Sequence, residues 1–409
     1  MRVHTLFKKL IGIAKLVVEG FRMDEDGLVF RVRPRAGRTR CGNCGAAAPV
    51  YDRRPNRRWR HLSVGATKLW LEYAPRRVYC RRCGVRNEQL PWAVQGSRFT
   101  MPGEELVAYL AQVMDKSAVT KLLGIAWVSV GAIVERVVAR NLDPDRLCGV
   151  RNIGIDEFSY RKHHRYLTVV VDHDRKRVIW AGKGRSAETL GAFFELLDPA
   201  QREAIATVTM DMAGGYIKAV EHYLPKAQII FDRFHVQCLA STAVDEVRRA
   251  QQRKLKGSDQ GRSLKRSRFA LLKGLWNLTQ TDKRKLSDIQ RTNKPLYRAY
   301  LLKEALADAL NYRQPARAKK ALRNWLAWAS RSRLKPFIRL ARTIRAHFDG
   351  IVAYIKNRQT NAAVEGINNR LRTVARRAYG FHSHQALIGM LFLCCGGIEL
   401  APPVPISPT

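Results

Sequence analysis

Residues 206–232 read ATVTMDMAGGYIKAVEHYLPKAQIIFD, and this stretch decides the fold. Two short apolar runs each end in an aspartate, at Asp211 and at Asp232, and between them apolar residues recur at helical spacing. The stretch therefore predicts a strand, a short helix and a second strand. A chain that alternates strands and helices in this way is typical of an α/β domain.

The same alternation extends from this stretch toward the N-terminus, as far as about residue 150. Three more strands are expected, at residues 153–156, 166–171 and 177–181. Ser186 is a good N-cap for the helix that follows them. Counted along the chain, the strand that ends at Asp211 is the fourth and the strand that ends at Asp232 is the fifth.

Downstream of this region, residues 240–345 lack strand patterns and are rich in Leu, Ala, Lys, Arg and Trp, which predicts an all-helical segment. Its start carries a run of basic residues that includes Arg248, Arg249, Arg253 and Lys254. Such a run is typical either of a surface that holds DNA phosphates or of a solvated face, and both interpretations stay open. A helix is expected again at residues 361–377, and the proline-rich tail 401–409 is expected to be disordered.

The first hundred residues are β-rich and carry two cysteine knuckles. The turn at residues 24–27 separates two candidate strands and predicts a hairpin. The knuckles are Cys41-Gly-Asn-Cys44 and Cys80-Arg-Arg-Cys83. Four thiolates in two such pairs match a tetrahedral site, so we expect one structural zinc ion; unpaired thiols or a redox pair are the alternative. The other cysteines lack this spacing and are expected to be buried thiols: Cys148, Cys238, Cys394 and Cys395.

The segment after the knuckles fits a helix-turn-helix. Residues 117–123 form its expected first helix, Gly124 its turn and residues 127–140 its recognition helix, which would lie in the major groove. The second helix carries few polar groups. Docking on phosphate or on protein therefore remains an alternative to the recognition of bases.

Charge points to a polyanionic partner. Lys and Arg number 74 against 34 Asp and Glu, which gives a formal net charge of +40. Nucleic acid accepts such an excess, because basic side chains release condensed counterions from phosphates. A ribosomal or chromatin-like protein is the simpler alternative, but such chains tend to be short or of low complexity. No apolar run reaches the roughly 18 residues of a membrane span and no export signal is evident, so no membrane partner and a cytoplasmic location are expected.

Three acidic residues carry the catalytic hypothesis. Asp156 lies on the first strand of the α/β region, Asp211 at the end of the fourth, and Glu365 on the helix after the helical segment. On a helical wheel Glu365 faces away from the apolar stripe, on the side of Asn368, Arg372 and Arg376, which are expected to contact DNA. Carboxylates brought together repel each other unless cations neutralise them. Two magnesium ions held by these three residues would serve an in-line displacement at phosphorus.

The motifs and their order resemble insertion-sequence transposases of the ISL3 family. They are the two knuckles, the helix-turn-helix, Gly154-Ile-Asp156-Glu157, Thr209-Met-Asp211-Met212, Phe231-Asp232-Arg-Phe-His235, Asn361-Ala-Ala-Val-Glu365-Gly-Ile-Asn-Asn369 and Ala375-Arg-Arg-Ala-Tyr-Gly-Phe381. The resemblance covers roughly residues 5–400. It implies a ribonuclease-H-like core with an all-helical insertion and an acidic triad of Asp156, Asp211 and Glu365. Asp232 and His235 resemble a pair that supports the catalytic residues rather than binding both metals.

The resulting expectation is a multidomain α/β protein with a zinc-binding β-rich N-terminal module. Its domains are residues 1–100 (zinc module), 101–145 (helix-turn-helix), 146–239 and 346–400 (two parts of the ribonuclease-H-like core), 240–345 (helical insertion) and 401–409 (tail). The resemblance implies a bacterial, nucleoid-associated enzyme that binds the terminal inverted repeats of a mobile element as a homo-oligomer, which is expected to be a dimer. It would use magnesium, for which manganese substitutes, to cut the ends and join their 3′-hydroxyls to target DNA. A domesticated, non-catalytic DNA-binding regulator and a plain nuclease are the alternatives, which inverted repeats in the flanking DNA would separate.

Overall fold

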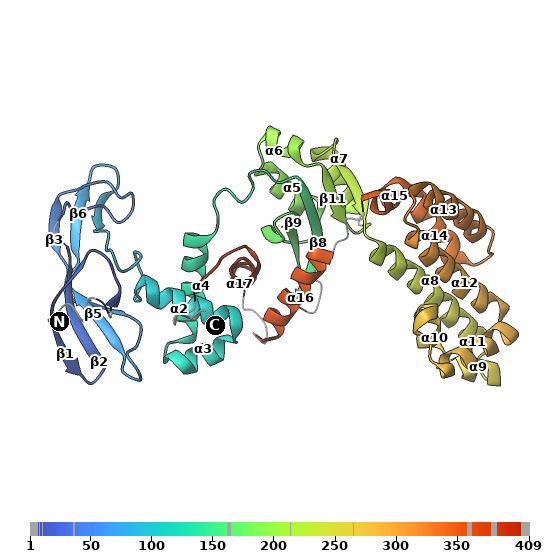
Figure 1. Cartoon of the computed structure of the whole chain (residues 1–409), viewed down its shortest axis with the longest axis horizontal. Coiled ribbons are helices and arrows are strands. Elements are labelled where there is room, and N and C mark those ends of the chain that lie inside the picture. The colour runs from blue at the N-terminus through green and yellow to red at the C-terminus, as the bar shows by residue number, and fades with distance from the viewer. Residues whose placement is uncertain are drawn as a thin grey trace. The chain divides into compact units, whose positions relative to one another are not determined.

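The computed structural model of the protein forms two compact units (Figure 1). It describes residues 7, 9, 11–35, 37–161, 165–212, 214–264, 266–357, 362–377 and 383–401. One unit comprises Met1–Asp143 with Arg376–Thr409, and the other comprises Pro144–Ala375. The expected tail lies outside the described residues, apart from Ala401.

The N-terminal unit begins with seven strands in two small sheets. They are β1 (Leu16–Asp24), β2 (Gly27–Pro34), β3 (Val50–Arg53), β4 (Arg57–Arg60), β5 (Leu69–Tyr73), β6 (Arg76–Cys80) and β7 (Gly84–Asn87). The strand orders are β1-β2-β5-β4 and β3-β6-β7. The expected hairpin is confirmed, because β1 and β2 pair antiparallel up to Asp24 and Gly27. Buried aromatic and aliphatic side chains, among them Phe30, Trp59 and Trp92, fill the first sheet's core.

Three helices follow and form the expected helix-turn-helix. They are α2 (Met101–Val113), α3 (Lys116–Leu123) and α4 (Trp127–Asn141). Gly124 ends α3 with a φ of 59°, a left-handed conformation that glycine adopts at no steric cost, and α4 leaves at 106° to α3. Among the described residues no single helix is long and apolar enough to span a membrane; only this bent pair passes such a test, and its apolar residues pack back into the unit.

A buried ion-pair cluster joins α2 to α4. The carboxylate of Glu104 is fully buried, and it accepts hydrogen bonds from Arg136 Nε at 2.6 Å and Arg140 Nη1 at 3.1 Å. The hydroxyl of Ser97 also donates to it at 2.7 Å. The two arginines of the recognition helix are therefore occupied in holding the unit together.

Replacing Glu104 by glutamine is expected to lower the free energy of unfolding by roughly 3 kcal/mol, because the change leaves two cations without their buried partner. The matched control is Glu105→Gln. Its carboxylate is half-exposed and lies 3.4 Å from Arg140, so the loss should stay below about 1 kcal/mol. Denaturant unfolding of the full chain measures both values, and equal losses in the two variants would contradict the prediction.

The second unit is built on a five-stranded mixed sheet. Its strands are β8 (Asn152–Arg161), β9 (Arg165–Asp172), β10 (Arg177–Lys183), β11 (Thr207–Met210) and β12 (Gln228–Phe231), in the order β10-β9-β8-β11-β12. The first three strands pair antiparallel, whereas β11 runs parallel to both β8 and β12. The fourth strand thus lies beside the first, and the fifth lies one place farther away. This confirms the predicted strand count.

Helices pack against this sheet, and the helices of the insertion form a bundle that shares one hydrophobic core with it. The helices between the strands are α5 (Ala187–Glu195), α6 (Pro199–Ala204) and α7 (Gly214–Tyr223). The insertion is all-helical, as predicted, and consists of α8 (Arg233–Lys254), α9 (Asp259–Leu264), α10 (Arg268–Leu272), η1 (Leu275–Asn277), α11 (Gln280–Thr292), α12 (Lys294–Asn311), α13 (Pro315–Ser330) and α14 (Lys335–Ala346). The chain then returns through α15 (Phe348–Asn357), which packs against β12.

The C-terminal helices correct the expected domain boundary. They are α16 (Ala362–Arg377) and α17 (His384–Cys395). Residues 376–400 were expected in the α/β core, but they cluster with the N-terminal unit, where α17 packs against α4 and α2. The side chain of Gln112 fixes this contact by donating to the carbonyl of Leu393 at 2.6 Å. The expectation for the remaining cysteines holds for Cys394 and Cys395, which are buried, and is wrong for Cys148 and Cys238, which are exposed.

Candidate active site and zinc site

Asp156 lies on β8, the central strand of the mixed sheet. It stands opposite Val169 of β9, and its carboxylate accepts a hydrogen bond from the backbone N–H of Glu157 at 2.7 Å. Burial raises the pKa of Asp156, and the negative charge of Asp211 adds to the rise. A carboxylate in such a place is costly unless a positive charge neutralises it.

Asp211 follows the last residue of β11 directly. Thr209 pairs with Gly154, so the next two positions along the parallel strands bring Asp211 level with Asp156. The electrostatic influence of Asp211 on Asp156 agrees with this register. Two of the three predicted catalytic acids thus lie side by side on neighbouring strands, at the C-terminal end of β11.

Asp232 lies at the end of β12, one strand beyond Asp211, and it begins α8. Its carboxylate accepts from the backbone N–H of Phe234 at 2.9 Å, which is the geometry of a helix N-cap. His235, in the first turn of α8, lies near enough for its charge to lower the pKa of Asp156. The pair therefore borders the acidic site, and Asp232 has a structural role at the start of the insertion.

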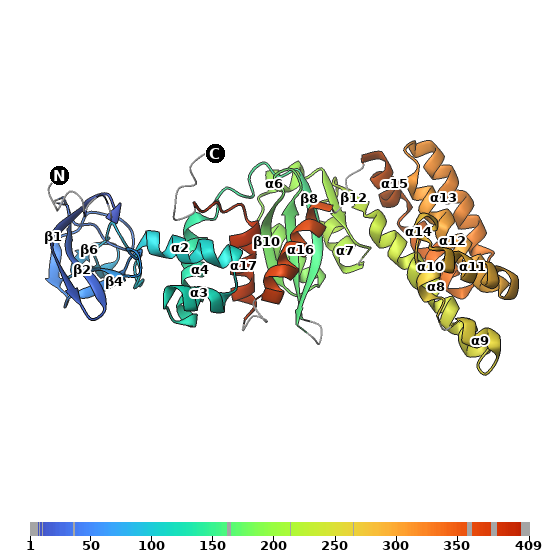
Figure 2. The same cartoon turned by 60° about the horizontal axis from the view of Figure 1, so that its bottom comes forward.

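Helix α16 lies beside β8 (Figure 2), and a side chain of its polar face, Asn368, contacts that strand. Asn368 is buried, and its Nδ2 donates to Asp156 Oδ2 at 2.5 Å. Among the described residues its Oδ1 finds no hydrogen-bond partner. Asn368 was expected to contact DNA; the structure instead places it against Asp156. Glu365 lies on the same helix, three residues earlier, but its side chain is outside the described part of the chain.

Glu157 directly follows Asp156 on β8 and is a further acidic residue, for which the sequence pattern predicted no role. Side chains alternate along a strand, so Asp156 faces Asn368 while Glu157 faces the side of Tyr216 on α7. Burial raises the pKa of Glu157, and Asp211 adds to the rise, whereas Arg185 at 3.7 Å opposes it. The hydroxyls of Tyr216 and Thr168 lie 2.7 Å apart beside this carboxylate. Its position directly after Asp156 was the sequence feature from which Glu157 could have been recognised.

The donor atoms at this edge suit magnesium. Asp156 and Asp211 bring carboxylate oxygens, and Asn368 brings a buried amide oxygen without a hydrogen-bond partner among the described residues. Hard oxygen ligands of this kind are those that magnesium and manganese prefer. The residues present therefore fit the predicted ion.

The predicted DNA-contacting residues fall into two groups. Arg372 and Arg376 are exposed on α16, and the charge of Arg372 reaches Asp156. In the run on α8, Arg253 and Lys254 are exposed. Arg248 instead is 8% exposed and lies 2.7 Å from Asp245, so the prediction that it contacts DNA is not supported by its place.

Arg249 also pairs with Asp245, at 2.8 Å. The one carboxylate thus holds both arginines at i,i+3 and i,i+4 spacing on α8. Arg253 and Lys254, at the C-terminal end of the basic run, are not part of these ion pairs with Asp245.

The four knuckle cysteines converge in the N-terminal unit. The Sγ atoms of Cys41, Cys44, Cys80 and Cys83 all lie within 4.8 Å of one another. Each knuckle ends in a glycine with positive φ, Gly45 at 70° and Gly84 at 73°, which lets the backbone turn tightly around the thiolates. Backbone N–H groups of Arg82 and Cys83 lower the pKa of Cys80 to about 7, which favours the thiolate that zinc binds. Four sulfur ligands leave no open position, so the site supports a structural zinc ion.

Three consecutive parts of the chain match models of known protein families. Residues 37–83 match the zinc-finger of transposases IS204, IS1001, IS1096 and IS1165, and residues 88–138 match the helix-turn-helix domain of transposase family ISL3. Residues 153–391, more than half of the chain, match the transposase domain of the same family.

Two kinds of relative extend over nearly the whole chain. The transposase for insertion sequence element IS1557 of Mycobacterium tuberculosis is 37% identical, over 97% of this chain and 96% of the relative. The transposase for insertion sequence element IS1001 of Bordetella parapertussis is 32% identical, over 93% of this chain and 95% of the relative. The chain with its zinc ribbon, helix-turn-helix and acidic α/β domain therefore belongs to the ISL3 family of transposases.

Proposed function

We propose that the protein binds the terminal inverted repeats of an insertion sequence, cleaves the element ends and joins the freed 3′-hydroxyls to target DNA. The observation that carries this proposal is the register that brings Asp211 beside Asp156 at one edge of the sheet. The strand order is the one that a ribonuclease-H-like core requires, with the first strand beside the fourth. Because the chain belongs to a transposase family, we propose DNA as the substrate of these acidic residues.

Asp156, Asp211 and Glu365 are the proposed magnesium ligands, and the strand register that brings Asp211 level with Asp156 supports two of them. Magnesium ions held by these residues would neutralise the negative charge that develops during an in-line displacement at phosphorus. Asn368 fixes the orientation of the Asp156 carboxylate through its 2.5 Å hydrogen bond. Arg372, exposed on the same helix, is placed to hold a non-bridging phosphate oxygen of the substrate.

The reaction consists of two phosphoryl transfers. In the first, water attacks the phosphodiester at the element end; a P–O bond to water forms, the bond to the 3′-oxygen breaks, and the 3′-oxygen leaves as a hydroxyl. In the second, this 3′-hydroxyl attacks a target phosphodiester and displaces another 3′-oxygen. The chain supplies ligands, orientation and positive charge in both steps. We also propose that the protein acts as a homo-oligomer, such as a dimer, and that it acts on the bacterial nucleoid.

Sulfur substitution at the scissile phosphate tests the metal contact. An element-end duplex with a phosphorothioate at that position should be cleaved poorly in magnesium, because magnesium binds sulfur weakly. Manganese, which accepts sulfur more readily, should restore cleavage of the same duplex. Equal cleavage of the oxygen and sulfur substrates in magnesium would count against direct metal contact at that phosphate.

Asn368→Ala is expected to raise the magnesium concentration needed for half-maximal cleavage by about 10- to 100-fold. The change removes the hydrogen bond that orients Asp156 and a buried amide oxygen that has no hydrogen-bond partner among the described residues. The matched control is Thr373→Ala, an exposed residue of the same helix whose hydroxyl donates to the backbone carbonyl of Asn369, and its magnesium requirement should not change. A magnesium titration of cleavage on saturating DNA measures both. An unaltered requirement in Asn368→Ala would mean that this hydrogen bond does not support metal binding.

A further inference from the structure

A basic cleft lies between the N-terminal sheet and the helix-turn-helix. It has a volume of about 840 Å³, and its walls carry five cations: Arg57, Arg58, Arg60, Lys68 and Arg98. Among the described residues that line it, none is acidic. The opposite wall is the turn at Gly124 and the first turn of α4.

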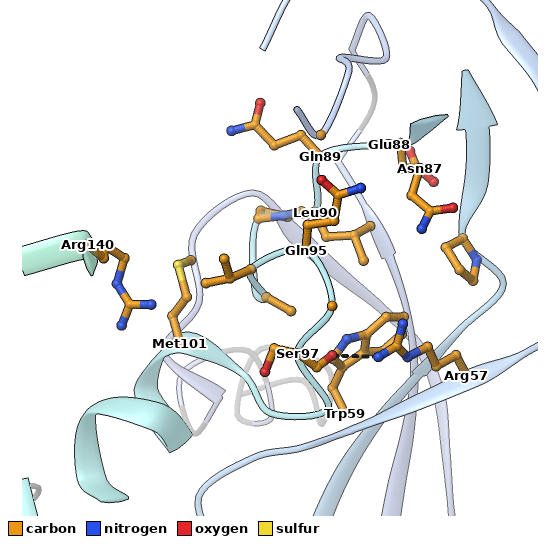
Figure 3. A pocket seen from close by; sticks show the side chains of 16 residues that line it. Arg57, Trp59, Asn87, Glu88, Gln89, Leu90, Gln95, Ser97, Met101 and Arg140 are labelled. Atoms are coloured by element: carbon orange, nitrogen blue, oxygen red, sulfur yellow. Dashed lines mark hydrogen bonds between the residues drawn. The ribbon is translucent and has the colours of Figure 1, made fainter. Parts of the chain in front are cut away.

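Most of these cations are not neutralised by the protein. Arg58 pairs with Asp24, Asp26 and Glu72, as cations on protein surfaces often do. The structure, where it describes the chain, shows no carboxylate within ion-pair distance of the other four. Arg57 instead donates to the carbonyl of Ser97 at 2.7 Å and lies over the ring of Trp59 (Figure 3).

Two of the unpaired cations repel each other. Burial lowers the pKa of Arg57, and the positive charge of Arg98 adds to this shift. Arg60 is buried and stacks over Trp70, and among the described residues its guanidinium donates to a serine hydroxyl, that of Ser63, rather than to a carboxylate. Like charges gathered without a counter-charge destabilise a fold. Their arrangement makes physical sense if an anion occupies the cleft.

The cleft adjoins the part of the protein that approaches DNA. The Lys68 side chain lies 4.0 Å from the position that a Cβ on Gly124 would take, so it reaches the turn between α3 and α4. The next helix begins after Ala126, which makes no side-chain cap, and its N-terminus carries partial positive charge toward the cleft. In a helix-turn-helix the N-terminal residues of the recognition helix face the base edges, and the flanking strand passes beside them.

From these observations we infer that the cleft binds the sugar-phosphate backbone of the element-end duplex, next to the major groove that α4 enters. Arg57, Lys68 and Arg98 hold the phosphates and the buried Arg60 adds positive charge to the wall of the cleft, so the zinc module and the helix-turn-helix grip one DNA segment together. This inference rests on the proposed function, because it takes the element end as the ligand. It also explains how an apolar recognition helix docks: the positioning comes from the cations beside the helix, since Arg136 and Arg140 are engaged by Glu104.

The test is the salt dependence of DNA binding by the full chain carrying both Lys68→Ala and Arg98→Ala. Fluorescence anisotropy is measured at a series of salt concentrations without divalent metal, on a duplex with the terminal inverted repeat and on a scrambled duplex of equal length. Losing two phosphate contacts should make the slope of log K against log salt less steep by about two, since each contributes roughly 0.9. Affinity should fall by the same factor for both duplexes, because phosphates carry no sequence information.

The matched control carries Arg54→Ala and Arg86→Ala, which remove two exposed cations of the same module outside the cleft. Its slope should stay close to that of the wild type. An unchanged slope in the cleft variant, or an equal change in the control, would overturn the inference, as would a loss confined to the inverted repeat. Unaltered thermal unfolding and zinc content show that the cleft variant folds. If the wild type does not prefer the inverted repeat, the proposed function fails, while the slopes still decide the role of the cleft.

Discussion

Replacing Asp211 by asparagine is expected to abolish cleavage of element ends and to leave DNA binding intact. The amide keeps the size of the side chain but loses the charge that balances a metal ion beside Asp156. We expect the cleavage rate to fall by at least about 1,000-fold, which corresponds to ~4 kcal/mol of transition-state stabilisation. Gel-based cleavage with magnesium and anisotropy without it measure the two properties separately.

The matched variant is Asp232→Asn, at the end of the neighbouring strand. Asparagine is as good an N-cap as aspartate, so the start of α8 should be preserved. Because β12 does not pair with β8, this carboxylate lies one strand farther from Asp156 than Asp211 does. Cleavage should therefore be retained. The reverse pattern, with Asp232→Asn inactive and Asp211→Asn active, would move the proposed metal site to the fifth strand.

Loss of zinc is expected to unfold the N-terminal module. Cys80→Ser removes one of four ligands that lie within 4.8 Å of one another. A structural zinc ion contributes about 10–16 kcal/mol, as much as the whole stability of a typical domain. The variant should contain no stoichiometric zinc, should be cut rapidly by protease within residues 1–100, and should lose specific binding of element ends.

The control for this prediction is Cys148→Ser, which changes an exposed thiol outside the cluster. It should keep zinc, protease resistance and DNA binding. Elemental analysis of natively purified wild type provides the decisive reading, since less than stoichiometric zinc there would contradict the proposed site.

The order of strands and helices was predictable because it depends on local patterns. Counting apolar runs identified the strand that ends at Asp211 as the fourth. The resemblance to a ribonuclease-H-like core implied that the fourth strand lies beside the first, and β11 does pair with β8. Gly124 likewise marked the turn between α3 and α4. The place of α17 was not predictable, since its partners α2 and α4 lie more than 240 residues earlier in the chain and no local pattern encodes that contact.

The candidate site divides in the same way. Asp156 was identified from its position on the first strand and Asp211 from its position at the end of the fourth, and the sequence encodes both positions directly. The polar face of α16 was also correct, but the partner of Asn368 lies 212 residues away on β8, and amphipathicity cannot tell a carboxylate from a phosphate. The burial of Arg248 had a local signal, since Asp245 lies three residues before it on the same helix.

Incubation of the purified protein with its own element ends and magnesium, followed by mapping of the product strands, decides whether the chain cuts and joins DNA. We expect breaks at the element terminus that leave 3′-hydroxyls, and later products in which those 3′ ends are covalently joined to target DNA. Both products should be absent with a scrambled duplex, and absent in Asp211→Asn. Tight, specific binding of the ends without any 3′-hydroxyl product would contradict the account and would identify the protein as a DNA-binding regulator.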